Sequence, residues 1–173
     1  GDRRAHREAD VQLQGDRPAG YAIARHWRAG DDRGHGGRRN GWGWGWGGDI
    51  TWESTEKVSR GTNAIKKVAE AWSGLFMHSD LLLHATDYQF VKMSIFPTES
   101  TKIMVTINSD TGDSAKGTTV TLVPGQWNNI SIPMSDLKLN QVGATFNNIF
   151  IKEYSGISLT PANTIYYDDI GFL

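Results

Sequence analysis

The sequence predicts an all-β fold, a β-sandwich of jelly-roll type built from two antiparallel sheets. Two observations predict it. Short runs of β-branched and aromatic residues alternate apolar with polar positions, and glycine or proline turn signals separate these runs at short intervals. The 173 residues contain no cysteine, and a domain of this size buries a sufficient core without disulfides or metals.

The alternation is clearest in residues 88–96, where Val91, Met93 and Ile95 share one face and the residues between them share the other. Pro97 ends this run, and five further runs of the same character follow it along the chain. We therefore expect strands at residues 88–96, 102–108, 118–123, 127–132, 148–153 and 164–173.

One segment carries a conflicting signal. Within residues 63–72, five apolar residues fall at helical spacing with good helix formers between them: Ala64, Ile65, Val68, Ala69 and Trp72. We nevertheless predict a strand, because the segment resembles a strand of the family described below. Residues 135–137 are expected to form a short helical turn or a loop.

Residues 1–40 differ in composition from residues 41–173, which we take as the β-sandwich domain. The first segment holds nine of the ten arginines and no lysine, and its net charge is +3 against −4 for the remainder. Its Arg/Gly-rich tract is typical of a linker or of disorder. A basic arm for an acidic polymer, an unnatural leader, a wrong reading frame and a first strand are the alternatives.

The charge and motif content exclude several function classes. The net charge of −1 gives no reason to expect nucleic acid or a membrane surface as a partner. No apolar run approaches the roughly 20 residues that a membrane-spanning helix needs. We expect no enzyme, because no catalytic motif is present and Glu53, beside tryptophans, is the best single candidate for a glycosidase carboxylate where two are needed.

Three segments together resemble jelly-roll carbohydrate-binding modules attached to bacterial glycoside hydrolases. Residues 58–77 contain Val-Ser-Arg-Gly-Thr-Asn-Ala-Ile followed by Ala-Trp-Ser-Gly-Leu-Phe. Residues 125–137 read Gly-Gln-Trp-Asn-Asn-Ile-Ser-Ile-Pro-Met-Ser-Asp-Leu, and residues 165–172 read Ile-Tyr-Tyr-Asp-Asp-Ile-Gly-Phe. The order and spacing of the segments carry the resemblance, which covers residues 42–173.

The resemblance implies a non-catalytic module that binds a polysaccharide and targets a linked glycoside hydrolase to it. The expected protein is secreted, extracellular, bacterial and monomeric. We expect a plant-type β-glucan as the ligand, β-1,4-linked as in cellulose or mixed-linked, with xyloglucan, xylan and β-1,3-glucan left open. The alternative is a structural or protein-interaction β-sandwich of an extracellular protein, which would bury its tryptophans.

The resemblance also implies a structural calcium ion that joins the last strand to the loop near Gly61. Calcium takes several oxygen ligands, from carboxylates and backbone carbonyls. The expected side-chain ligands are Asp168, Asp169 and Thr62, together with carbonyls of residues 60–63. The alternative is an aspartate that is hydrogen-bonded to nearby backbone amides.

Sugar rings stack their apolar faces on aromatic side chains, while polar groups bind the hydroxyls. Glycines alternate with Trp42, Trp44 and Trp46, so a strand here places the three indoles on one face. Trp44 and Trp46 are the preferred sugar contacts, and core packing of one or more indoles is the alternative. For Trp52, which shares a face with Ile50, core packing competes with ligand contact.

A second group of candidates surrounds residue 75. Trp72, Phe76 and His78 share a parity opposite to Leu75 and Met77, so they line the open face if the latter two point into the core. His78 and Lys92 are the polar candidates on that face. Trp127 is expected to anchor the core, and Tyr154 to lie at the rim of a groove.

Overall fold

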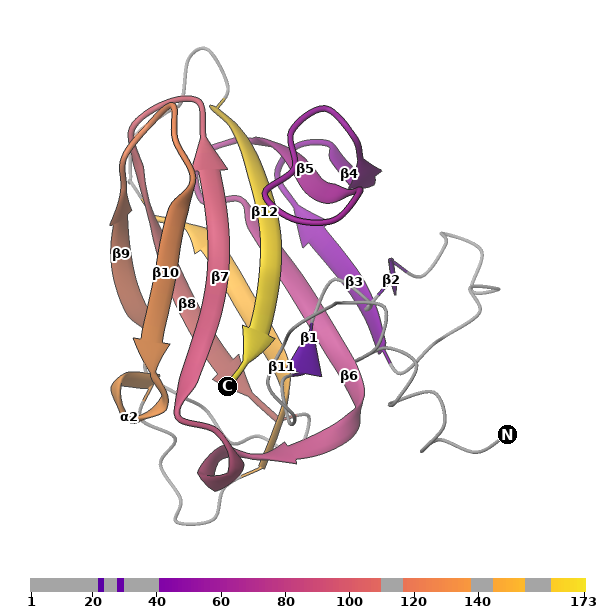
Figure 1. Cartoon of the computed structure of the whole chain (residues 1–173), viewed down its shortest axis with the longest axis vertical. Coiled ribbons are helices and arrows are strands. Elements are labelled where there is room, and N and C mark those ends of the chain that lie inside the picture. Colours follow the sequence, from indigo (N-terminus) through magenta and orange to yellow (C-terminus); the bar gives the residue numbers. More distant parts are fainter. Residues whose placement is uncertain (1–21, 24–27, 30–40, 110–116, 138–144, 155–162) are drawn as a thin grey trace.

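The computed structural model describes residues 22–23, 28–29, 41–109, 117–137, 145–154 and 163–173. It contains two sheets, here called sheet A and sheet B (Figure 1). Sheet A has the spatial order β10-β7-β12-β5-β4, with β1 beside β12, and sheet B has the order β2-β3-β6-β11-β8-β9. All neighbouring strands are antiparallel except the short β2–β3 pair.

The bounds of sheet A are β1 (Ala22–Ile23), β4 (Ile50–Ser54), β5 (Ala64–Ala69), β7 (Phe90–Pro97), β10 (Asn128–Pro133) and β12 (Asn163–Phe172). Those of sheet B are β2 (Arg28–Ala29), β3 (Gly41–Trp46), β6 (Gly74–His84), β8 (Thr101–Asn108), β9 (Thr118–Leu122) and β11 (Thr145–Glu153). The described helical turns are η2 (Ala85–Asp87) and α2 (Met134–Leu137). The predicted sandwich is therefore confirmed, as are the six strands expected between residues 88 and 173 and the short helical turn at 135–137.

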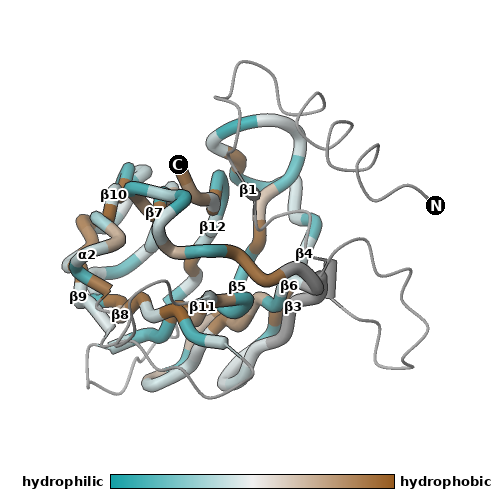
Figure 2. Tube along the Cα trace, turned by 90° about the horizontal axis from the view of Figure 1, so that it is seen from below, coloured by the Kyte–Doolittle hydropathy of each residue, from teal (hydrophilic) through white to brown (hydrophobic). Residues whose placement is uncertain are grey.

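The two sheets stack as layers, which Figure 2 shows from one end of the strands. Alternate residues of each strand point between the layers, as the period of two in the sequence requires. In β7 and β8 the inward residues are no more than 2 % exposed: Val91, Met93, Ile95, Ile103, Val105 and Ile107. The described part of the chain contains no helix long and apolar enough to cross a membrane.

The segment with helical spacing is the strand β5, as predicted. It pairs with β12 on one side and β4 on the other, so its backbone groups are taken up by ladders rather than by a helix. Ile65, Lys67 and Ala69 are all no more than 3 % exposed. Lys67 occupies the middle inward position, and this charged residue conceals the period of two in the sequence.

Two short pieces of residues 1–40 belong to the sandwich. β1 pairs with the end of β12, and β2 lies parallel to β3 at the edge of sheet B. The rest of this segment lies outside the described residues. The nature of residues 1–40 as leader, linker or first strand stays a prediction.

Lys67 is a fully buried lysine that joins the two sheets. Its Nζ donates a hydrogen bond of 2.9 Å to the backbone carbonyl of Trp46, the last residue of β3. Burial lowers the pKa of Lys67 to about 8, although the carboxylates of Glu70 and Asp49 act in the opposite direction. This bond ties the end of β3 to sheet A.

Replacing this residue, Lys67→Met, tests the buried charge. Between the folded-state pKa of about 8 and the usual 10.5, the unfolded chain binds more protons, so the free energy of unfolding rises with pH. We expect the stability of the wild type relative to Lys67→Met to increase by about 1.5 kcal/mol from about pH 8 to about pH 9.5. Urea unfolding of both proteins across this range measures it, and a pH-independent difference would contradict the buried ammonium group.

Candidate functional site

The outer face of sheet B consists of rows of side chains that cross the strands. In antiparallel pairs, register partners lie on the same face of the sheet. One row joins Trp46 of β3 to Gly74 of β6 and Lys152 of β11. The next row joins Phe76 to Phe150. Leu75 and Met77 point into the core with no exposed surface, which meets the condition under which Phe76 and His78 face outward.

A third row on this face is polar. His78, Asn148 and Asn108 are register partners on β6, β11 and β8. His78 Nδ1 lies 2.7 Å from Asn148 Oδ1, and Asn148 Nδ2 donates to Asn108 Oδ1 at 2.9 Å. With the Asn148 oxygen turned to the ring, Nδ1 is the protonated nitrogen that donates this bond. Asn148 is only 4 % exposed, so it fixes the half-buried His78 and Asn108 on either side of it, beside the aromatic row.

Trp72, at the aromatic end of the face, is the most exposed large apolar side chain of the described residues. It is 56 % exposed, and its φ of 62° lies in the left-handed region, which a bulky residue rarely adopts. Its ring packs edge-on against Tyr154, with centroids 5.5 Å apart. Tyr154 is itself 41 % exposed, so the two rings form an aromatic pair open to solvent.

Glu153 fixes the backbone of Trp72. The Trp72 N–H donates to Glu153 Oε2 at 3.0 Å, and the Thr101 hydroxyl donates to Oε1 at 2.6 Å. Glu153 is only 1 % exposed, and its own N–H donates to the Ser73 carbonyl at 2.7 Å. Hydrogen bonds to a buried carboxylate are strong and costly to break. They therefore hold the unfavourable φ of Trp72 in place.

Trp46 lies flat against Gly74 on the same side. A Cβ at Gly74 would come within 2.3 Å of the indole carbons, so only glycine leaves room for this ring. Trp46 Nε1 donates to the Trp72 carbonyl at 2.8 Å. Trp46, Trp72 and Tyr154 thus form one connected group, which we call the aromatic platform.

The Phe row continues the platform toward the polar row. The rings of Phe76 and Phe150 are 4.6 Å apart, and Phe76 stacks on His78 with centroids 6.5 Å apart. Lys152 Nζ lies 5.7 Å above the Phe150 ring. The outer face of sheet B therefore combines aromatic surface, a cation and amide groups on a rigid ladder, which is chemistry suited to a ligand with both apolar faces and hydroxyls.

The structure brings together only some of the predicted site residues. Trp46, Phe76 and His78 lie on sheet B. Trp72 lies in the turn before β6, so the alternation of a strand, which predicted its place beside Phe76 and His78, does not apply to it. The side chain of Trp44 lies outside those described, although its backbone is the register partner of Phe76. Trp52 is in β4 of sheet A and packs against the core.

Two further residues lie elsewhere than the sequence predicted. Lys92 is on β7, in sheet A, so it does not share a face with His78. Trp127 was expected in the core, and this is wrong: the ring is half-exposed and packs on Phe96, an outward residue of β7. The reason is that position 127 precedes β10 and leaves the inward positions to Ile130 and Ile132.

Asp168 acts on the backbone of the loop that the calcium prediction invoked. Its Oδ2 accepts 2.9 Å hydrogen bonds from the N–H groups of Ser59 and Arg60, and its Oδ1 accepts one from the Asp169 N–H. Thr62 is exposed, and the described residues hold no group of three metal-binding side chains. N–H donors facing both oxygens match the alternative expectation, an aspartate hydrogen-bonded to backbone amides, rather than a calcium shell. The calcium ion stays a prediction.

Several site residues were missed from the sequence. Asn108, Asn148, Phe150 and Lys152 lie on the outer face of their strands, opposite to Ile149 and Ile151 in the case of β11. That alternation was visible and was the available signal. Glu153 gave no such signal, because its role depends on a turn 81 residues earlier in the chain.

Comparisons with known proteins show the fold. No family model matches the sequence, and no curated protein matches it. Among solved structures, a variant of the carbohydrate-binding module CBM29-2 matches with a TM-score of 0.56 at 10% identity, over 90% of this chain and 92% of that one.

Two complexes of CBM29-2 variants are also similar to this chain. The variant with mannohexaose has a TM-score of 0.55 at 10% identity, over 90% of this chain and 92% of that one. The variant with cellulohexaose has a TM-score of 0.54 at 11% identity, over 88% and 89%. At such identities the likeness establishes the β-sandwich fold.

The backbone strain at Trp72 predicts an unusual order of stabilities. Glycine adopts a positive φ without strain, whereas alanine keeps the strain and loses the ring. We expect Trp72→Gly to be more stable than Trp72→Ala by about 1 kcal/mol in urea unfolding. The reverse order would show that residue 72 is not held in the left-handed region.

Proposed function

We propose that this chain is a non-catalytic carbohydrate-binding module and that the outer face of sheet B binds an extended β-linked glucan chain. The observation that carries the proposal is Trp72, whose ring is 56 % exposed on a backbone with φ 62°. Exposure and strain both lower stability, and strained residues cluster where a ligand is bound. The loss of stability from this exposed ring and its strained backbone is best explained by a ligand that stacks on the ring.

The mechanism follows from the rows of the face. The apolar faces of the sugar rings stack on the aromatic platform, while His78, Asn108 and Lys152 hydrogen-bond the hydroxyls. Asn148, only 4 % exposed, holds His78 and Asn108 in place between them. The platform is rigid before binding, because Trp46, Trp72 and Glu153 are joined by hydrogen bonds. Little conformational entropy is then lost on binding.

The β-1,4-linked glucan is the first choice of ligand. It is a long flat chain that suits a row of rings, and solved complexes of the structural neighbours contain cellulohexaose or mannohexaose. With the sequence resemblance, this supports a role in holding a linked glycoside hydrolase at its polysaccharide, in a secreted bacterial protein. Tethering raises the local concentration of the substrate around the catalytic domain.

The direct test is Trp72→Ala against a matched control, Val123→Ala, which removes a similarly exposed apolar side chain (51 %) just after β9. We expect Trp72→Ala to weaken binding of cellohexaose at least tenfold, about 1.4 kcal/mol, because a stacking surface is lost. Val123→Ala should bind as the wild type does. Isothermal calorimetry measures both, after circular dichroism shows that both are folded.

Affinity electrophoresis extends the test to polymers. Gels with cellulose derivatives, mixed-linked β-glucan, xyloglucan, xylan or mannan rank the ligands by the retardation of the wild type. Unretarded migration of the folded protein in every gel would overturn the proposal in favour of a structural or protein-interaction domain. Equal retardation of the wild type and Trp72→Ala would instead place the binding site away from the platform.

A further inference from the structure

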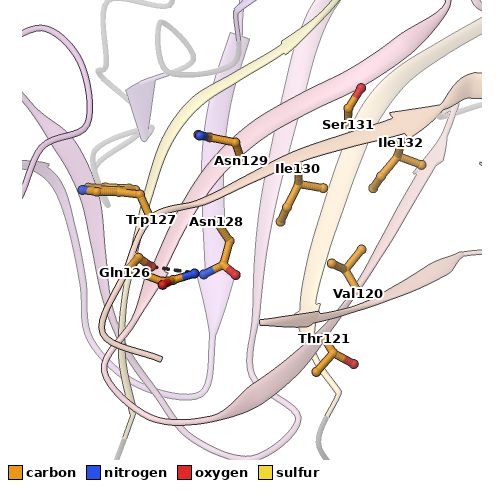
Figure 3. Close-up of a pocket in the computed structure, with 9 residues that line it drawn as sticks. All are labelled: Val120, Thr121, Gln126, Trp127, Asn128, Asn129, Ile130, Ser131 and Ile132. Atoms are coloured by element: carbon orange, nitrogen blue, oxygen red, sulfur yellow. Dashed lines mark hydrogen bonds between the residues drawn. The ribbon is translucent and has the colours of Figure 1, made fainter. Parts of the chain in front are cut away.

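We propose that the chain has a second saccharide-binding site, at the edge of the sandwich where β9 and β10 meet and centred on Trp127. A hollow of about 420 Å³ lies here, lined by residues of β9, β10 and the turn between them (Figure 3). That volume is within the range of small-molecule sites in proteins. The hollow lies where β9, the edge strand of sheet B, meets β10, the edge strand of sheet A. The strand β3, which carries Trp46 of the aromatic platform, lies toward the opposite edge of sheet B.

The lining suits a neutral, polyhydroxylated ring. Val120, Ile130 and Ile132 point toward one another in Figure 3, and Ile130 and Ile132 belong to the core with 9 % and 4 % exposure. Thr121, Asn129 and Ser131 alternate with these residues and point away from them. The surface that a ligand can reach beside Trp127 therefore consists of the exposed Gln126, Asn129 and Ser131. No charged side chain lines the hollow. An anionic ligand such as a phosphate or a carboxylate would find no counter-charge there, whereas a sugar needs none.

Several hydrogen-bonding groups at the hollow have no partner within the described part of the chain. These are the Trp127 Nε1, the Gln126 side-chain amide and the Asn129 Nδ2, although Asn129 Oδ1 accepts from the Ser94 hydroxyl at 3.0 Å. A flat aromatic ring beside amides is the combination that recognises the C–H face and the hydroxyls of a pyranose. The chemistry therefore assigns a saccharide as the occupant.

The ring of Trp127 is rigidly mounted, as a stacking residue needs to be. Its turn is locked by Asn128, whose Oδ1 accepts from the Val123 N–H at 2.9 Å and whose Nδ2 donates to the carbonyls of Val123 and Gln126. The Trp127 ring packs edge-on against Phe96 at 5.6 Å. This order before binding reduces the entropy lost with the ligand.

An aromatic row extends from Trp127 across the outer face of sheet A. Phe96 is the register partner of Tyr166 on β12, and their rings are 6.2 Å apart. The Tyr166 hydroxyl donates to Glu56 Oε2 at 3.0 Å, and Lys57 Nζ lies 4.3 Å from the Phe96 ring centre. Tyr166 is only 7 % exposed, so this row supports the Trp127 ring and adds little ligand surface of its own.

Two separate sites on one sandwich have a consequence that a single site lacks. One molecule then contacts two polysaccharide chains, so it cross-links polymers and gains avidity on surfaces where chains are dense. The second site stands on its own lining, and it can exist even if the face of sheet B binds nothing.

The test is fluorine NMR of protein labelled with 5-fluorotryptophan, in which each of the seven tryptophans gives its own signal. Trp127→Phe identifies the Trp127 signal by its loss. In the Trp72→Ala background, we expect that signal to shift saturably as cellohexaose or mannohexaose is added. Gln126→Ala should weaken this effect at least threefold, whereas Val123→Ala, exposed in the same turn but outside the lining, should not.

A Trp127 signal that stays in place with both sugars up to about 10 mM, a range that reveals millimolar binding, would overturn the second site. If the tryptophan signals of sheet B shift with sugar in the wild-type protein, the first site still stands. Conversely, the Trp127 signal could shift with sugar while Trp72→Ala binds cellohexaose as tightly as the wild type does. This result would support the second site and overturn the first. A shift that disappears in Trp72→Ala would show that the Trp127 signal only reports the platform.

Discussion

The buried carboxylate of Glu153 is the constraint on which the binding face depends. It lies at the end of β11 and accepts hydrogen bonds from Trp72, just before β6, and from Thr101, at the start of β8. Three neighbouring strands of sheet B are therefore fixed at one end through one side chain. Because a buried carboxylate without donors is very costly, the chain keeps Trp72 in a backbone conformation that it would otherwise avoid.

The same strands supply both the core and the proposed site. In β11, Ile149 and Ile151 fill the interior, while Asn148 and Phe150 on the opposite face extend the rows from β6. Packing of the inward residues thus sets the positions of the outward ones, and the buried Asn148 holds His78 and Asn108 at fixed positions. On sheet A the same logic places Phe96 and Tyr166 outward, beside Trp127.

Most of the fold was predictable from the sequence, because strands with one inner face show their period of two directly. The binding site was less predictable from the sequence. Parity assigned Phe76 and His78 to an outer face correctly, but it does not say which sheet a strand joins, and Lys92 therefore lies on the other sheet. Trp127 was misplaced because a motif, not a packing argument, assigned it. Glu153 depends on a contact between distant segments, which no local pattern reveals.

The most direct measurement is a double-mutant cycle between Trp72 and Glu153 in binding of cellohexaose. Glu153→Leu has similar volume but accepts no hydrogen bond, whereas Glu153→Gln retains one acceptor oxygen. If Glu153 holds the platform, the folded Glu153→Leu protein loses as much affinity as Trp72→Ala, the double variant loses no more, and Glu153→Gln retains part of it. A folded Glu153→Leu protein that binds cellohexaose as tightly as the wild type would contradict the account.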